Sequence, residues 1–156
     1  MKINSELHNP IESKVAPEDL EILESIQDRV LWLSTRIVDY ANNDRPNVDG
    51  LKVGGHQASS ASLVSVLTAL YFNYLDSEDR ISIKPHASPV FHAIQYLLGN
   101  LDESYLKKLR EAGGLQSYPS RTKDPDTVDF STGPPRSTHS GTLFPDATRY
   151  QVVAHD

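Results

Sequence analysis

The sequence predicts a helix-rich α/β chain that folds as one small domain. Four segments carry apolar residues at the spacing of three and four positions that is typical of amphipathic helices. Residues 80–85 alternate apolar and polar side chains, as a short strand does. The chain has 156 residues, of which 38% are hydrophobic and 23% charged, enough for one domain with its own core. Residues 1–16 are polar, and we expect them to form an N-terminal arm.

Composition excludes several classes of protein. The net charge of −6, with no basic patch, argues against nucleic-acid binding. The absence of cysteine excludes disulfides, thiolate zinc sites and a cysteine nucleophile. The first ten residues lack the apolar core of a signal peptide, and no apolar stretch approaches the ~20 residues of a membrane helix. We therefore expect a soluble, cytoplasmic protein with neither a nucleic-acid nor a membrane partner.

The first helix is expected from Pro17 to about Asn42. Proline suits a first helical turn, and Glu18 and Asp19 favour the positive end of the helix dipole. One apolar face is formed by Leu20, Leu23, Ile26, Val30, Leu33 and Ile37. The turn-forming residues 43–50 then end the helix.

The second helix is expected at residues 58–75, followed by a polar break and the short strand. The middle of this helix is apolar nearly all round, so we expect it to be buried on most sides. In the strand, Ile81 and Ile83 share one face. A helix buried on most sides needs more packing partners than the other elements supply. Part of the fold is therefore expected to be missing, or to come from another chain.

The third and fourth helices are expected at residues 89–98 and 102–112. The third has Pro89 near its start and Gly99 just past its end, which is the usual asymmetry. Asp102 is expected to cap the fourth, which Gly113 and the following glycine then end. From residue 115 onwards the sequence is rich in Pro, Ser, Thr, Gly and Asp, and we expect irregular structure.

Two histidines stand immediately before predicted helices. His56 follows Gly54 and Gly55 and precedes the second helix, and His86 follows the strand and precedes the third. Helix N-termini present unpaired N–H groups and the positive end of a dipole, so two of them beside histidines predict an anion site, most simply for a phosphate or diphosphate. On pattern alone, the commoner interpretation of each is a loop histidine packed beside a helix start.

Five segments together resemble a known family. They are GGHQAS at 54–59, HASPVFHAIQYLLG at 86–99, LDESYLKKLRE at 101–111, GLQSYPS at 114–120 and DFSTG at 129–133. Over these segments the chain resembles the N-terminal part of the pyrophosphate-binding domain of thiamine-diphosphate enzymes. It is most similar to the pyruvate dehydrogenase E1 component and next to transketolase. The resemblance implies an α/β thiamine-diphosphate-binding fold, present over residues 17–133 as an incomplete, helix-rich portion.

The resemblance also implies a cofactor, a reaction and site residues. His56 and His86 would line the cofactor cleft as the catalytic residues, with Ser59 and Gly55 beside the phosphates. The cofactors of the parent family are thiamine diphosphate and Mg²⁺, and its reaction is the oxidative decarboxylation of pyruvate, a 2-oxo acid, with acetyl transfer to lipoyl groups. Two alternatives stay open. One is a transketolase-type two-carbon transfer, and the other is a non-catalytic helical piece that associates with a full-length subunit.

The sequence departs from the family pattern at two points. The family's metal motif is Gly-Asp-Gly, which occurs nowhere in this chain, so no metal ligand is predicted. Pro134 and Pro135 follow where the family continues with a helix, which proline blocks. We therefore expect residues 134–156 to be an irregular tail outside the family pattern, as in a truncated or frameshifted product. The pyrimidine-binding domain is also absent, so the chain alone is expected to be inactive.

Other residue patterns have simpler interpretations. His92, six residues after His86, is expected to be a partly buried helix histidine, since this spacing is not one helical turn and no third zinc ligand is evident. Ser59, Ser60 and Ser62 are more often helix caps than phosphate donors. A Ser-His-Asp hydrolase is disfavoured because no G-x-S-x-G motif is present.

Overall fold

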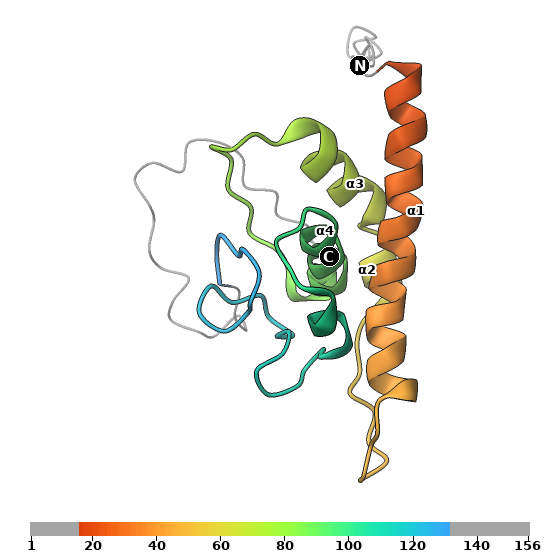
Figure 1. Ribbon diagram of the computed structural model, residues 1–156, viewed down its shortest axis with the longest axis vertical. Coiled ribbons are helices and arrows are strands. Elements are labelled where there is room, and N and C mark those ends of the chain that lie inside the picture. Colours follow the sequence, from red (N-terminus) through yellow and green to blue (C-terminus); the bar gives the residue numbers. More distant parts are fainter. Residues whose placement is uncertain (1–15, 132–156) are drawn as a thin grey trace, which may run out of the picture.

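A computed structural model describes residues 16–131, in which a long helix, α1, lies along one side of a group of shorter helices (Figure 1). Helices α2, α3 and α4 all pack against α1, and the last described residues run as an irregular loop beside α4 (Figure 1). The predicted arm, apart from Ala16, and the predicted tail at 134–156 lie outside the described residues. No helix among the described residues is long and apolar enough to cross a membrane.

Helix α1 spans Pro17–Asp39 and begins where the sequence predicts. Its buried side chains lie on one face, and they are Val30, Leu33, Ser34, Ile37 and Val38. The helix does not end at residue 42, because a π-helical turn, η2, continues it over Tyr40–Asp44. This turn positions Asn42 close to the loop that precedes α2.

The prediction of a single helix at 58–75 is wrong, because three short helical segments take its place. They are α2 at Gln57–Ala61, α3 at Val64–Ala69 and a π-helical turn, η3, at Leu70–Tyr74. The break falls at Ser62, whose hydroxyl donates to the carbonyl of Ser59 at 2.8 Å. Serine side chains compete with helical backbone hydrogen bonds in this way. The expected burial on most sides is also wrong, because Val66 is 49% exposed and Tyr74 63% exposed.

The strand expected at 80–85 does not form. Residues 79–84 carry no regular structure, and no strand is found anywhere in residues 16–131. A strand needs a neighbour to share its backbone hydrogen bonds, and the described part of the chain provides none for this segment. The N–H of Ile81 donates instead to Asp129 Oδ2 at 2.9 Å. The alternation itself is confirmed, since Ile81 and Ile83 are buried and Ser82 is exposed. The α/β class therefore stays a prediction.

Helix α4 is the centre of the core. A short 3₁₀ turn, η4, at Pro85–Ala87 leads into α4 at Ser88–Leu97, which matches the predicted third helix. Every side chain from Ser88 to Gln95 is buried. A helix buried all round is a core helix rather than an amphipathic surface helix. It ends at Gly99, whose positive φ of 80° completes the helix C-terminus.

The fourth helix is shorter than predicted. Asp102 does cap it, since its carboxylate accepts the Ser104 N–H at 2.9 Å, but the element is only the 3₁₀ turn η5 at Glu103–Lys107. An isolated bridge between Leu109 and Leu115 follows. Residues 116–131 contain no helix or strand, which confirms the predicted irregular structure over this range. We call residues 116–131 the C-terminal loop.

Candidate functional site

The structure brings the two predicted site histidines together. His56 ends the loop before α2, and His86 lies in η4, thirty positions later in the sequence. Their ring centroids are 4.0 Å apart, and the ring planes are tilted by 41°. The His56 side chain is exposed and that of His86 is half-buried, so the pair lies at the surface. Neither ring forms a hydrogen bond to another of the described residues.

The loop that carries His56 is tied to α1 and η2. The Gly54 N–H donates to Asn42 Oδ1 at 2.8 Å, and Asn42 Nδ2 donates back to the Gly54 carbonyl at 3.0 Å. Gly55 has a φ of 138°, and a Cβ at this position would lie 2.6 Å from Cγ1 of Val38 on α1. Only glycine allows the loop to pass α1 so closely in this conformation. Gly55 thus has a packing role whether or not it lies beside phosphates.

The predicted phosphate contacts stay a prediction. Ser59 is half-buried within α2, and its carbonyl accepts the Ser62 hydroxyl. Helix α2 has only five residues, so its dipole is small and supplies little attraction for an anion. Ser60 points inward, and its hydroxyl is buried without a hydrogen-bond partner.

A hollow of about 340 Å³ lies elsewhere, and it contains none of the predicted site residues. It is lined by Ala41, Arg45, Pro46, Asn47, Asp49, Leu51, Lys52, Val53 and Arg110. Its two arginines are engaged by the backbone. Arg45 donates to the Leu109 carbonyl at 2.8 Å, and Arg110 donates to the Val53 carbonyl at 2.6 Å. They fasten the loop before α2 to the chain after η5, and this role is structural.

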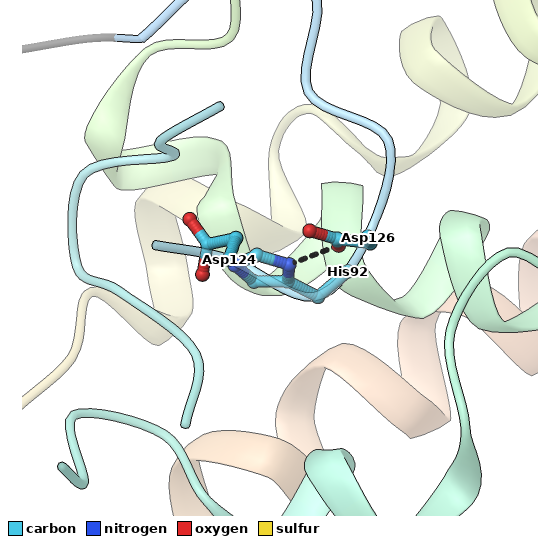
Figure 2. A group of neighbouring side chains, drawn as sticks. All are labelled: His92, Asp124 and Asp126. Carbon is cyan, nitrogen blue, oxygen red and sulfur yellow. Dashed lines mark hydrogen bonds and ion pairs between the residues drawn. The ribbon is translucent and has the colours of Figure 1, made fainter. Parts of the chain in front are cut away.

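A second group of polar side chains lies in the interior, between α4 and the C-terminal loop. His92 Nδ1 and Asp126 Oδ2 are 2.6 Å apart, and both side chains are fully buried (Figure 2). The carboxylate of Asp124 lies on the other side of the His92 ring (Figure 2). His92 is therefore a helix histidine, as expected, but it is fully rather than partly buried.

Asp124 is held by the backbone of its own loop. Its Oδ1 accepts the Gln116 N–H and its Oδ2 accepts the Ser120 N–H, each at 2.7 Å. Burial is the largest influence on Asp124 and raises the pKa of its carboxyl, against the opposing effect of the Gln116 N–H. The nearby Tyr71 has its pKa raised as well, mainly by burial and further by Asp129 and Asp126. This interior is therefore an unfavourable place for uncompensated negative charge.

Sequence reasoning missed both aspartates. Asp126 stands 34 positions after His92, in a loop without periodicity, so no local pattern connects the two. The only signal is the Asp-Pro-Asp run at 124–126, which puts two carboxylates close together in the chain. Such runs are common in turns, and nothing in the run itself points to a buried histidine.

Comparison with known proteins shows that most of this chain is similar to part of the pyruvate dehydrogenase E1 component, and we call the matched part an E1-like region. No family model matches the chain. It is 32% identical over 125 residues to the pyruvate dehydrogenase E1 component of Pseudomonas aeruginosa, covering 74% of this chain and 14% of that protein. The E1 components of Mycobacterium tuberculosis and Mycolicibacterium smegmatis are each 32% identical over 127 residues, again with 74% of this chain and 13% of theirs. The chain spans about one seventh of the length of these curated relatives.

Proposed function

We propose that this E1-like region contributes His56 and His86 to a thiamine-diphosphate site of the pyruvate dehydrogenase E1 type. The reaction served is the oxidative decarboxylation of pyruvate with acetyl transfer to lipoyl groups, and the parent fold is the α/β thiamine-diphosphate-binding fold. One observation carries the proposal. Two imidazoles, from the GGH and H-x-S-P segments that resemble the family, lie with their ring centroids 4.0 Å apart.

The histidine pair suits the positioning of an anionic or carbonyl group. An imidazole offers one N–H donor and one acceptor nitrogen when neutral, and two donors when protonated. Two of them side by side can hold a phosphate oxygen or a substrate carbonyl and exchange a proton with it. Thiamine diphosphate, when bound, supplies the carbanion stabilisation that decarboxylation requires.

The residues present fit only part of the cofactor. Both imidazoles are accessible to its organic or diphosphate end. Mg²⁺ prefers carboxylate and amide oxygens, and the printed sequence has no Gly-Asp-Gly motif to supply them. The proposal therefore assigns no Mg²⁺ ligand to this chain and expects no turnover of pyruvate by the chain alone.

An NMR titration tests the proposal directly. The full chain is titrated with thiamine diphosphate and Mg²⁺ up to millimolar concentration while the imidazole C–H signals are followed. The signals of His56 and His86, assigned with His56→Gln and His86→Gln, are expected to shift, whereas the buried His92 signal stays in place. A control variant, His8→Gln, removes an imidazole elsewhere in the sequence and leaves both His56 and His86 in the chain. Absence of any shift in the folded chain refutes the proposal, as does turnover of pyruvate by the chain alone.

A second function, a non-catalytic interaction piece, is favoured by exposed apolar residues on α1. Trp32 is 60% exposed, with Ile22 and Leu31 exposed on the same helix. Large apolar side chains that stay exposed can mark a protein contact. Because Trp32 is the only tryptophan of the chain, its fluorescence reports directly on the surroundings of this side chain. A blue shift on mixing with a complete E1 component, lost in Trp32→Ser, supports this function, and an unchanged spectrum rejects it.

A further inference from the structure

We propose that His92, Asp124 and Asp126 form a binding site for one divalent transition-metal ion, represented by Zn²⁺. Each residue offers one ligand atom, and the three atoms all lie within 4.8 Å of one another. The three side chains come from α4 and the C-terminal loop and gather around the His92 ring (Figure 2). The three residues of this site do not include His56 or His86.

Two buried atoms in the group have no partner. His92 Nε2 and Asp126 Oδ1 are both inaccessible to solvent, and neither forms a hydrogen bond within residues 16–131. Native proteins rarely leave buried polar atoms in this state, and an ion or an ordered water is the usual explanation. Both side chains are fully buried, so solvent cannot supply the missing partner from the surface. A metal ion would bind the lone pairs of buried atoms that have lost their hydrogen bonds to water and gained none within the protein.

The charges of the group match a divalent cation. Two carboxylates flank a single imidazole, which balances at most one negative charge even when it is protonated. The neighbouring Asp129 adds a further carboxylate, but it accepts the Ile81 N–H and lies 3.8 Å from Arg80. A 2+ ion therefore neutralises the carboxylates of Asp124 and Asp126 and leaves the surrounding pair of Asp129 and Arg80 unchanged.

The donor atoms favour zinc-like metals over magnesium or calcium. An imidazole nitrogen with carboxylate oxygens suits Zn²⁺ and its neighbours in the first transition series, whereas Mg²⁺ and Ca²⁺ favour oxygen ligands.

The group is also held rigidly. His92 lies on the buried part of helix α4, and two backbone N–H groups fix the carboxylate of Asp124. Ligands held by their surroundings lose little conformational entropy when a metal binds. Because the ligands join α4 to the C-terminal loop, a bound ion would fasten that loop to the core.

Isothermal titration of the full, chelator-treated chain with Zn²⁺ alone tests the proposal. We expect one ion per chain, and at least a roughly tenfold weaker affinity in Asp124→Asn and Asp126→Asn. Asp129→Asn, a carboxylate of the same loop, is the matched control and keeps the wild-type affinity. The double variant His56→Gln/His86→Gln also keeps it, which separates this site from the surface histidines and from the proposed function.

A second measurement needs no variant, in case loss of a buried carboxylate prevents folding. Co²⁺ added to the wild-type chain is expected to give the visible absorption bands of low-coordinate cobalt and to broaden the buried His92 NMR signals. The proposal is overturned if the folded chain binds no Zn²⁺ at millimolar concentration. It is also overturned if binding survives Asp124→Asn and disappears in His56→Gln/His86→Gln, or if Asp129→Asn weakens binding as much as Asp124→Asn does.

Discussion

Replacing Gly55 by alanine tests how closely the loop that carries His56 must pass α1. The new Cβ would lie 2.6 Å from Cγ1 and 3.1 Å from Cγ2 of Val38, a side chain that is itself buried. Overpacking of this kind costs about 1–3 kcal/mol. The φ of 138° adds a backbone cost of about 1–3 kcal/mol for a residue with a Cβ. We therefore expect Gly55→Ala to lower the free energy of unfolding by about 2–6 kcal/mol.

Two further variants separate the steric part from the backbone part. Gly99 also has a positive φ, but a Cβ there meets nothing within 4 Å, so Gly99→Ala should cost only about 1–2 kcal/mol. Val38→Ala removes the two methyl groups that Gly55→Ala would strike, at a cost of about 1.5–2.5 kcal/mol of its own. In the Val38→Ala background, Gly55→Ala should lower the free energy of unfolding by less than in the wild type, which corresponds to a coupling energy between the two substitutions of about 1–3 kcal/mol.

Urea unfolding followed by circular dichroism measures the wild type and the four variants, with constant m-values confirming that only stability has changed. The reasoning is refuted if Gly55→Ala costs no more than Gly99→Ala, or if Val38→Ala leaves the cost of Gly55→Ala unchanged. A positive result has a functional corollary. The displaced loop should move His56 away from His86, and the NMR response of the pair to thiamine diphosphate should weaken.

Three other substitutions probe the core, the buried pair and a helix cap. Ile94→Ala, in the fully buried part of α4, is expected to lower the free energy of unfolding by about 2–5 kcal/mol. Val66→Ala, on the exposed side of α3, should change it by no more than about 0.5 kcal/mol. Urea unfolding midpoints compare the two variants. Asp126→Ala leaves the His92 imidazole buried and unpaired, and in chelator-treated protein it should lower the free energy of unfolding by about 3–5 kcal/mol, a value that calorimetry can contradict. The pKa of Asp102 is lowered mainly by hydrogen bonds from Ser104, so its capping contribution exists above the ordinary carboxyl pKa and is lost as pH falls through the lowered one. As the pH falls below about 4, the unfolding midpoint of the wild type should therefore drop more than that of Asp102→Asn. Equal dependence of the two midpoints on pH would contradict this assignment.

Local patterns predicted the elements that depend on local chemistry. Helix α1 begins at Pro17 because proline and acidic residues favour a first turn, and α4 runs between Pro89 and Gly99 for similar reasons. The cap at Asp102 was also predictable from its side chain alone. The burial of Ile81 and Ile83 followed from simple alternation.

Elements that depend on distant partners were not predictable in this way. The alternating segment at 80–85 lacks a neighbouring strand within the described residues, and its Ile81 N–H finds a side chain 48 positions away instead. The helix expected at 58–75 breaks where Ser62 bonds to the backbone, a competition that periodicity does not detect. The resemblance predicts that His56 and His86 line one cofactor cleft, but it does not predict the direct contact of their rings. Their role toward a cofactor stays a prediction. The partnership of His92 with Asp126 depends on how the C-terminal loop folds over α4, and no sequence pattern encodes that path.

The surface histidine pair and the interior group are joined by a short chain of contacts. Asp124 accepts the Gln116 N–H at 2.7 Å, and the Gln116 carbonyl accepts the Ser88 hydroxyl at 3.3 Å. Ser88 is the first residue of α4 and directly follows η4, the turn that holds His86. Each contact is between buried or half-buried groups, so a change in how Asp124 is held alters the packing at the start of α4. An ion at the interior group would therefore stabilise the same turn that sets the position of His86, even though it touches neither surface histidine.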